Sequence, residues 1–117
     1  MGLNIYLEKR ERVAGWGYGS FAEFRRRLAL QVGIELDRME GFGGTRPWSE
    51  VEDPIRLLLN HSDCDGELNA EACAIIEPRL RELVSSWEDG DFDKQRALLL
   101  AEAMREASES ESRLLFS

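Results

Sequence analysis

The chain has 117 residues, of which 43% are hydrophobic, and a formal net charge of −8. A chain of this length has room for one core and too many apolar residues to be disordered, so we expect residues 1–117 to form a single domain. No apolar run approaches the roughly 20 residues that span a bilayer, and no basic stretch followed by an apolar one opens the sequence, so we expect a cytoplasmic protein without membrane segments.

The charge is unevenly distributed along the chain. Residues 1–60 contain nine acidic and nine basic residues, whereas residues 61–117 contain fourteen acidic and six basic ones. An acidic half repels the phosphates of nucleic acids and attracts basic surfaces. The composition therefore favours another protein, and a basic one, as the partner, and makes nucleic acid an improbable one.

The first residues favour a short strand. Residues 3–8 alternate apolar and polar side chains, which is typical of a strand, and residues 9–12 form a charged turn. Trp16 and Tyr18 then alternate with glycines, which excludes a regular helix. With the nearby arginines, these two aromatic side chains could form a stacking surface for a nucleotide or nucleic acid. The alternative is that they pack over the helix that follows.

The first helix is predicted from residue 20 to about residue 32. Ser20 and Glu23 have the spacing of a capping box, and Gly33 is a suitable C-terminal cap. Apolar residues recur at helical intervals and define the inner face: Phe21, Phe24, Leu28 and Val32. This pattern leaves the three arginines at positions 25–27 largely outside.

Residues 34–53 form a predicted connection with one helical turn near residues 36–39. A short helix should follow at residues 54–59, because Asp53 can cap it and Pro54 suits its first position. After a loop, Asn69 caps a helix over residues 70–87, in which Pro78 is expected to cause a kink.

The last predicted helix runs from Asp91, its cap, to about Ser108. Its predicted inner face consists of Leu98, Leu99, Ala101, Met104 and Ala107. The apolar tail at residues 113–116 can pair with the N-terminal strand. We therefore predict a mainly α (α+β) fold, with about four helices, an EF-hand-like helix–loop–helix and a small two-stranded pairing of the termini.

The segment from Asn60 to Cys73 is the best candidate for specific chemistry. If Gly66 takes the sixth position of an EF-hand loop, carboxylates fall at the third and fifth positions and a backbone carbonyl at the seventh. The first position holds His61 and the twelfth holds Ala72, so both end ligands of a calcium loop are replaced. The calcium ligands that remain are Asp63, Asp65, the Glu67 carbonyl and, with a shifted helix start, Glu71.

Other interpretations of this segment remain open. The aspartates can cap nearby backbone amides while Gly66 takes a positive φ and Leu68 anchors the loop, which makes the segment purely structural. His61, Cys64 and Cys73 could bind zinc with one aspartate, although the paired spacing of zinc sites is missing and Cys73 falls on the inner face of its helix. The two cysteines could also form a disulfide, but in the cytoplasm we expect free thiols.

A thiol enzyme is a further interpretation, with Cys64 as the nucleophile and His61 as its base. The neighbouring aspartates would raise the pKa of the thiol and weaken it as a nucleophile.

Three stretches of the sequence resemble an uncharacterised family of small bacterial and bacteriophage proteins. They are the Gly-Tyr-Gly-Ser-Phe run before the first helix, the Met-Glu-Gly-Phe run at residues 39–42, and Leu-Leu-Asn-His-Ser-Asp-Cys-Asp-Gly-Glu at residues 58–67. The resemblance implies a self-contained domain and no particular activity, cofactor or catalytic residue.

The sequence as a whole favours a non-catalytic protein-binding or regulatory module. The alternatives are a cation-binding module of the calcium type, and a small thiol- or metal-dependent enzyme around His61 and Cys64, with Asn60 beside them in the same segment.

Overall fold

The computed structural model describes residues 3–7, 12–16, 20–60 and 66–116. Within these ranges the fold is mainly α with a small antiparallel sheet, as the sequence predicts. The helices are α1 (Ser20–Gln31), α2 (Arg56–Leu59), α3 (Ala70–Val84) and α4 (Phe92–Ser110), with the 3₁₀ turns η1 (Leu36–Arg38) and η2 (Trp48–Glu50). The strands are β1 (Leu3–Leu7), β2 (Arg12–Trp16), β3 (Glu67–Leu68) and β4 (Leu114–Phe116).

The strands form one four-stranded sheet in the order β2-β1-β4-β3. The predicted pairing of the two ends of the chain is confirmed, since Ile5 of β1 lies opposite Phe116 of β4. The partner of β1 on its other side is β2, which the sequence did not predict, because a glycine at position 15 and a charged residue at position 12 resemble a turn. Ile5 and Phe116 are buried, whereas Tyr6 and Leu115 on the opposite face are half-buried.

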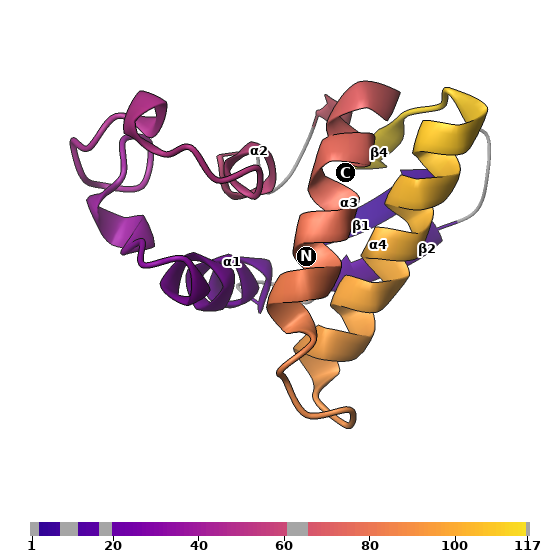
Figure 1. Ribbon diagram of the computed structural model, residues 1–117, viewed down its shortest axis with the longest axis horizontal. Helices are drawn as coiled ribbons and strands as arrows, with labels where there is room; N and C mark the ends of the chain where they lie inside the picture. Colours follow the sequence, from indigo (N-terminus) through magenta and orange to yellow (C-terminus); the bar gives the residue numbers. More distant parts are fainter. Residues whose placement is uncertain (1–2, 8–11, 17–19, 61–65, 117) are drawn as a thin grey trace.

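The helices are arranged in two groups (Figure 1). The long helices α3 and α4 lie side by side over one face of the sheet, while α1, α2 and the segment between them extend to one side. Aromatic rings join the groups: Phe24 of α1 stacks on Trp16 of β2 at 4.9 Å and meets Trp87, after α3, edge-on at 6.2 Å. The buried apolar side chains form one continuous cluster.

The helix α1 begins and ends close to where its caps predict. Gly33 has a φ of +76°, which suits glycine, and its amide and that of Ile34 donate to the last carbonyls of the helix. The expectation that all three arginines lie outside is wrong for Arg25, which is 2% exposed. Its guanidinium contacts the Phe21 and Phe42 rings and donates to the Leu59 carbonyl at 3.1 Å, so a buried charge is stabilised by rings and a carbonyl.

The helix α3 follows its predicted cap, whereas the cap predicted for α2 is wrong. Asp53 accepts a hydrogen bond from the amide of Ile55 in the turn before α2, but the helix begins at residue 56 instead of residue 54, with Ile55 at the N-cap position and no side-chain cap. Asn69 accepts from the amide of Ala72 at 2.8 Å and caps α3 as predicted. The helix ends at Val84, and Trp87 follows in a turn and is still buried.

The helix α4 corrects the predicted inner face. Asp91 caps it as expected by accepting from the amide of Lys94. Leu98 and Leu99, which the sequence assigned to the core, are 38% and 49% exposed. The prediction is confirmed for Ala101, Met104 and Ala107, and the inner face is completed by Ala97, Leu100 and Ala103. Small alanines let α4 approach α3 and the sheet closely, and the adjacent leucines are turned outward.

Candidate functional site

The segment with the predicted chemistry is described only in part. Asn60 is exposed and lies directly after α2. His61, Asp63, Cys64 and Asp65 lie outside the described residues, so the predictions that depend on them stay predictions. The described part of the segment begins at Gly66.

The residues after this gap have two features of the predicted loop. Gly66 has a φ of +95°, and Leu68 is 6% exposed in β3 and belongs to the core. The Glu67 carboxylate forms an ion pair with Arg113 at 2.7 Å, so a cation could use its backbone carbonyl, as predicted, more readily than its side chain. Glu71 is exposed near the start of α3. Among the described residues, no group of three or more His, Cys, Asp or Glu side chains could hold a metal ion.

Cys73 is a core residue with a free thiol. It is fully buried, its sulfur contacts the Leu68 carbonyl at 3.8 Å, and burial raises the pKa of the thiol to about 11. A protonated, buried thiol is a poor nucleophile and a poor metal ligand. This environment fits the structural role that the sequence allowed for Cys73.

Trp16 packs over α1, which is the second of the two alternatives predicted for it. It is 3% exposed, with its ring centroid 5.1 Å from that of Phe21, so it has no open face on which a base could stack. Tyr18 lies outside the described residues.

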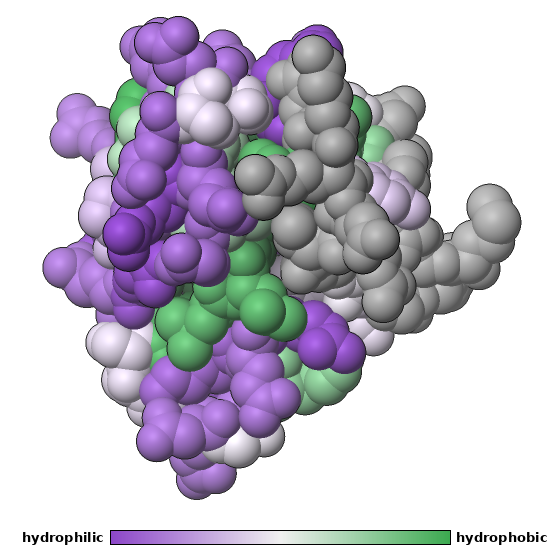
Figure 2. Space-filling view, turned by 90° about the vertical axis from the view of Figure 1, so that its right-hand side faces the viewer, coloured by the Kyte–Doolittle hydropathy of each residue, from purple (hydrophilic) through white to green (hydrophobic). Residues whose placement is uncertain are grey.

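The outward side of α4 carries a surface that the sequence did not predict. We call Phe92, Gln95, Leu98, Leu99 and Glu102 the α4 outer face. Phe92, Leu98 and Leu99 are 51%, 38% and 49% exposed. Figure 2 views the side of the molecule that carries α4 and shows an apolar patch next to hydrophilic side chains. Isolated exposed apolar residues are common, but Leu98 and Leu99 are adjacent on α4, and neighbouring exposed apolar side chains are of the kind used for association.

The charges near this face are of both signs, since the Arg96 guanidinium lies 4.3 Å from the centre of the Phe92 ring. Arg81 of α3 is shared between Glu77 and Glu102, so this cluster keeps one negative charge in excess. At the start of α4, on the side that meets α1 and not on the outer face, Arg27 is likewise shared between Asp91 and Asp93. In both clusters two carboxylates share one guanidinium, and the helix pair retains a negative potential.

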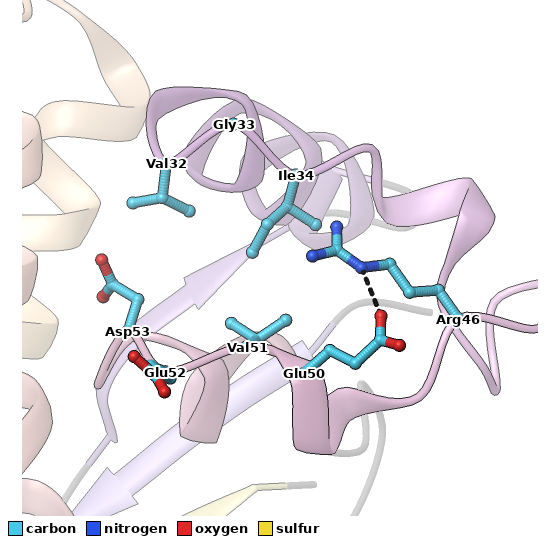
Figure 3. Close-up of a pocket in the computed structure, with 8 residues that line it drawn as sticks. All are labelled: Val32, Gly33, Ile34, Arg46, Glu50, Val51, Glu52 and Asp53. Atoms are coloured by element: carbon cyan, nitrogen blue, oxygen red, sulfur yellow. Dashed lines mark hydrogen bonds and ion pairs between the residues drawn. The ribbon is translucent and has the colours of Figure 1, made fainter.

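A second candidate site is a pocket of about 280 Å³ at the end of α1 (Figure 3). Its lining residues are Val32, Gly33, Ile34, Arg46, Glu50, Val51, Glu52 and Asp53. Figure 3 shows the apolar side chains in the middle, with Arg46 and Glu50 at one end and Glu52 and Asp53 at the other. Arg46 donates to Glu50 at 3.3 Å.

Asp53 links this pocket to α3. Its carboxylate forms an ion pair with Arg79 at 2.7 Å and accepts from the amide of Ile55. Burial alone would raise the pKa of Asp53, but these hydrogen bonds and the charge of Arg79 outweigh burial and lower the pKa. Asp53 is therefore ionised at neutral pH and is engaged mainly in holding the structure.

The run of leucines in α4 could have predicted an exposed apolar face, although helical spacing alone did not show which leucines are exposed. Three consecutive leucines at positions 98–100 cannot all face inward, because neighbouring helical residues point about 100° apart. At least one had to lie outside.

Comparisons with known proteins found no match to this chain. No protein-family model, no curated protein and no solved structure matches this chain. Among the described residues, no helix is long and apolar enough to cross a membrane. A functional proposal must therefore rest on the two surfaces described above.

Proposed function

We propose that this chain is a protein-binding module whose α4 outer face docks a basic, amphipathic segment of another protein. The observation that carries this proposal is the exposure of Leu98 and Leu99, at 38% and 49%, beside the carboxylate of Glu102. No catalytic chemistry is required of this surface.

The apolar side chains provide the free energy of such an interaction. Complete burial of a leucine side chain contributes about 1.5–3 kcal/mol, so covering the exposed parts of Leu98, Leu99 and Phe92 would favour association. A helical surface of this kind suits a partner helix that places apolar residues at intervals of three and four. The rest of the partner's residues would contact the polar rim.

Charge selects a basic partner over a second copy of the same chain. The chain carries a net charge of −8, and Glu102 shares its arginine with Glu77. A second copy would bring a like-charged surface to the face, whereas lysines or arginines flanking an apolar stripe would be attracted to it.

A titration with synthetic helical peptides tests the proposal. We expect a leucine–lysine amphipathic peptide to bind, and the double variant Leu98→Gln/Leu99→Gln to bind it at least about tenfold more weakly. Leu30→Gln is the matched control, because Leu30 is 66% exposed on α1, away from this face, and its replacement should leave the affinity unchanged. Calorimetry at low salt and at roughly 0.3 M salt should show weaker binding at the higher ionic strength.

Two outcomes contradict the proposal. One is equal binding of the lysine peptide to the double variant and to the unaltered chain. The other is equal binding of a leucine–glutamate peptide, since it would show that charge plays no part in recognition.

A cation-binding module is the second candidate, and the positive φ of Gly66 and the buried Leu68 fit it as well as they fit a purely structural turn. A calcium ion bound only by the folded chain would raise its melting temperature, and Asp65→Ala would remove the gain. Identical melting in chelator and in millimolar calcium would exclude this candidate.

A further inference from the structure

Arg96 of α4 carries a positive charge that no carboxylate among the described residues neutralises. Its guanidinium lies 4.3 Å from the centre of the Phe92 ring, and its Nε donates to the Gly15 carbonyl of β2 at 3.1 Å. The nearby arginines differ, because Arg81 and Arg105 each form an ion pair with a glutamate. A ring and a carbonyl therefore fix the position of the Arg96 guanidinium, and neither removes its charge.

The negative charge of the α4 outer face lies further along the same helix. Glu102 is 57% exposed and pairs with Arg81 at 2.9 Å, but Arg81 also pairs with Glu77, so one negative charge of this cluster remains in excess. The exposed leucines at positions 98 and 99 come between Arg96 and Glu102. The face consequently has a positive end, an apolar centre and a negative end.

Arg96 is close enough to the apolar centre to take part in its contacts. Phe92, Arg96 and Leu99 are separated by four and three residues, so they lie on the same side of α4. A segment that covers the exposed part of Leu99 therefore comes within reach of the guanidinium one turn away. With its Nε engaged by a carbonyl, the guanidinium still has four N–H donors on its two Nη atoms, which is the arrangement that a carboxylate accepts from.

We propose that the segment that docks on the α4 outer face carries a carboxylate as well as basic residues, and that these opposite charges fix the direction in which it docks. The segment is the partner helix of the proposed function, on which this inference rests. Its carboxylate pairs with Arg96, its apolar residues cover Leu98 and Leu99, and a lysine or arginine approaches Glu102. The segment is still basic as a whole, because the chain carries a net charge of −8.

The spacing of the two charges on the partner follows from helix geometry. Arg96 and Glu102 are six residues apart, which corresponds to about 9 Å along the axis of α4. Two turns of a partner helix, or seven residues, span about 10.5 Å and return to the same face. We therefore expect the carboxylate and the basic residue of the partner to be seven residues apart, with the apolar residues between them.

Charge order then determines direction. A segment in which the carboxylate precedes the basic residue matches α4 when the two helices are parallel, and a segment with the reverse order matches when they are antiparallel. In the wrong direction like charges would meet at both ends, which is unfavourable.

Two helical peptides of identical composition test this inference on the full chain. Each has leucines at intervals of three and four, one glutamate and one lysine seven residues apart on the leucine side, and further lysines on the opposite side. A nitroxide at the N-terminus of the peptide broadens the NMR signals of nearby amides. We expect broadening near residues 92–96 when the glutamate comes first, and near residues 106–110 when the lysine comes first.

Variants of the chain show whether Arg96 causes the preference. The unaltered chain should bind the peptide with glutamate about threefold more tightly than a peptide with glutamine at that position. Arg96→Gln should remove this preference, whereas Arg38→Gln, which removes the same charge from a side chain 78% exposed in η1, should keep it. Glu102→Gln is a second test that leaves the bond to Gly15 intact, and it should weaken the preference for lysine over glutamine at the other position by a similar factor.

Docking of both peptides in the same direction would overturn this inference, as would equal binding of the glutamate and glutamine peptides by the unaltered chain. The double variant Leu98→Gln/Leu99→Gln separates this failure from a failure of the proposed function. If that variant loses binding but direction does not follow charge order, the α4 outer face is the docking site and only the role of Arg96 is wrong. If that variant binds both peptides as tightly as the unaltered chain does, the proposed function and this inference are both wrong.

Discussion

The α4 outer face and the pocket at the end of α1 both combine apolar and acidic side chains, but they present them in opposite ways. On α4 the apolar side chains protrude, with Leu99 49% exposed, and the carboxylates lie around them. In the pocket the apolar side chains are recessed, with Val51 5% exposed, and the charged groups stand above them. A protruding surface suits another macromolecule, and a recessed one suits a small group.

The two surfaces differ because α4 and the segment before α2 bury different kinds of side chain in the core. The helix α4 fills its inner side with alanines such as Ala97 and Ala101, which leaves its larger side chains for the surface. The segment between η2 and α2 places Val51 and Ile55 inward and leaves Glu52 and Pro54 outside. A similar mixture of apolar and acidic side chains can therefore form a protruding or a recessed surface, depending on which of the side chains are buried in the core.

The largest expected effect comes from neighbouring leucines of α4. Leu100→Ala should destabilise the fold by about 2–5 kcal/mol, because it leaves a cavity, whereas Leu99→Ala should change stability by no more than about 0.5 kcal/mol. Denaturant unfolding measures both variants. A loss at Leu99 comparable to that at Leu100 would place Leu99 in the core and remove the α4 outer face.

The next effect concerns the rim of the pocket. Asp53→Ala removes the hydrogen bond from the Ile55 amide and the ion pair with Arg79, and should cost about 2 kcal/mol, since the carboxylate is only 18% exposed. Glu52→Ala, at the adjacent position, should change stability by less than about 0.5 kcal/mol. Unfolding curves of equal midpoint for the two variants would contradict the separate roles given to these carboxylates.

A smaller effect should appear in acid. The pKa of Asp53 in the folded chain is lower than its ordinary value of 3.8, so its ionised form stabilises the fold above that value. This contribution is lost as the pH falls through the lower, folded pKa. Stability measured from about pH 6 to about pH 3 should therefore fall less steeply for Asp53→Asn than for the unaltered chain. Parallel curves would show that Asp53 is not coupled to folding.

The smallest effect is on a reaction rate, namely the alkylation of the buried thiol of Cys73 in α3. In a Cys64→Ser variant the remaining thiol, Cys73, has a pKa of about 11 and is fully buried. At pH 8 only about one thiol in a thousand would be ionised, so alkylation should be very slow until the chain is unfolded. Rapid alkylation of the folded variant would mean that α3 opens readily and that neither surface is rigid.

The sequence by itself determined the local features of this protein. The caps at Asn69 and Asp91, the turn at Gly33 and the pairing of the terminal strands all follow from nearby residues or from simple alternation, and the structure confirms them. The caps and the turn depend on hydrogen bonds and backbone angles within a few residues, which the sequence specifies directly. The strand pairing joins Ile5 to Phe116 across the whole chain, and it was predicted because a lone strand edge needs a partner.

Only the tertiary structure decided which side chains face outward. Arg25 is buried through contacts with Phe42 and the Leu59 carbonyl, both distant in sequence, and Leu98 and Leu99 are exposed because alanines on α4 face its neighbours. The pocket, in turn, requires the end of α1 to meet residues 46–53. Burial depends on the free energy of contacts between distant segments, and helical spacing does not specify which of two adjacent apolar residues those contacts will cover.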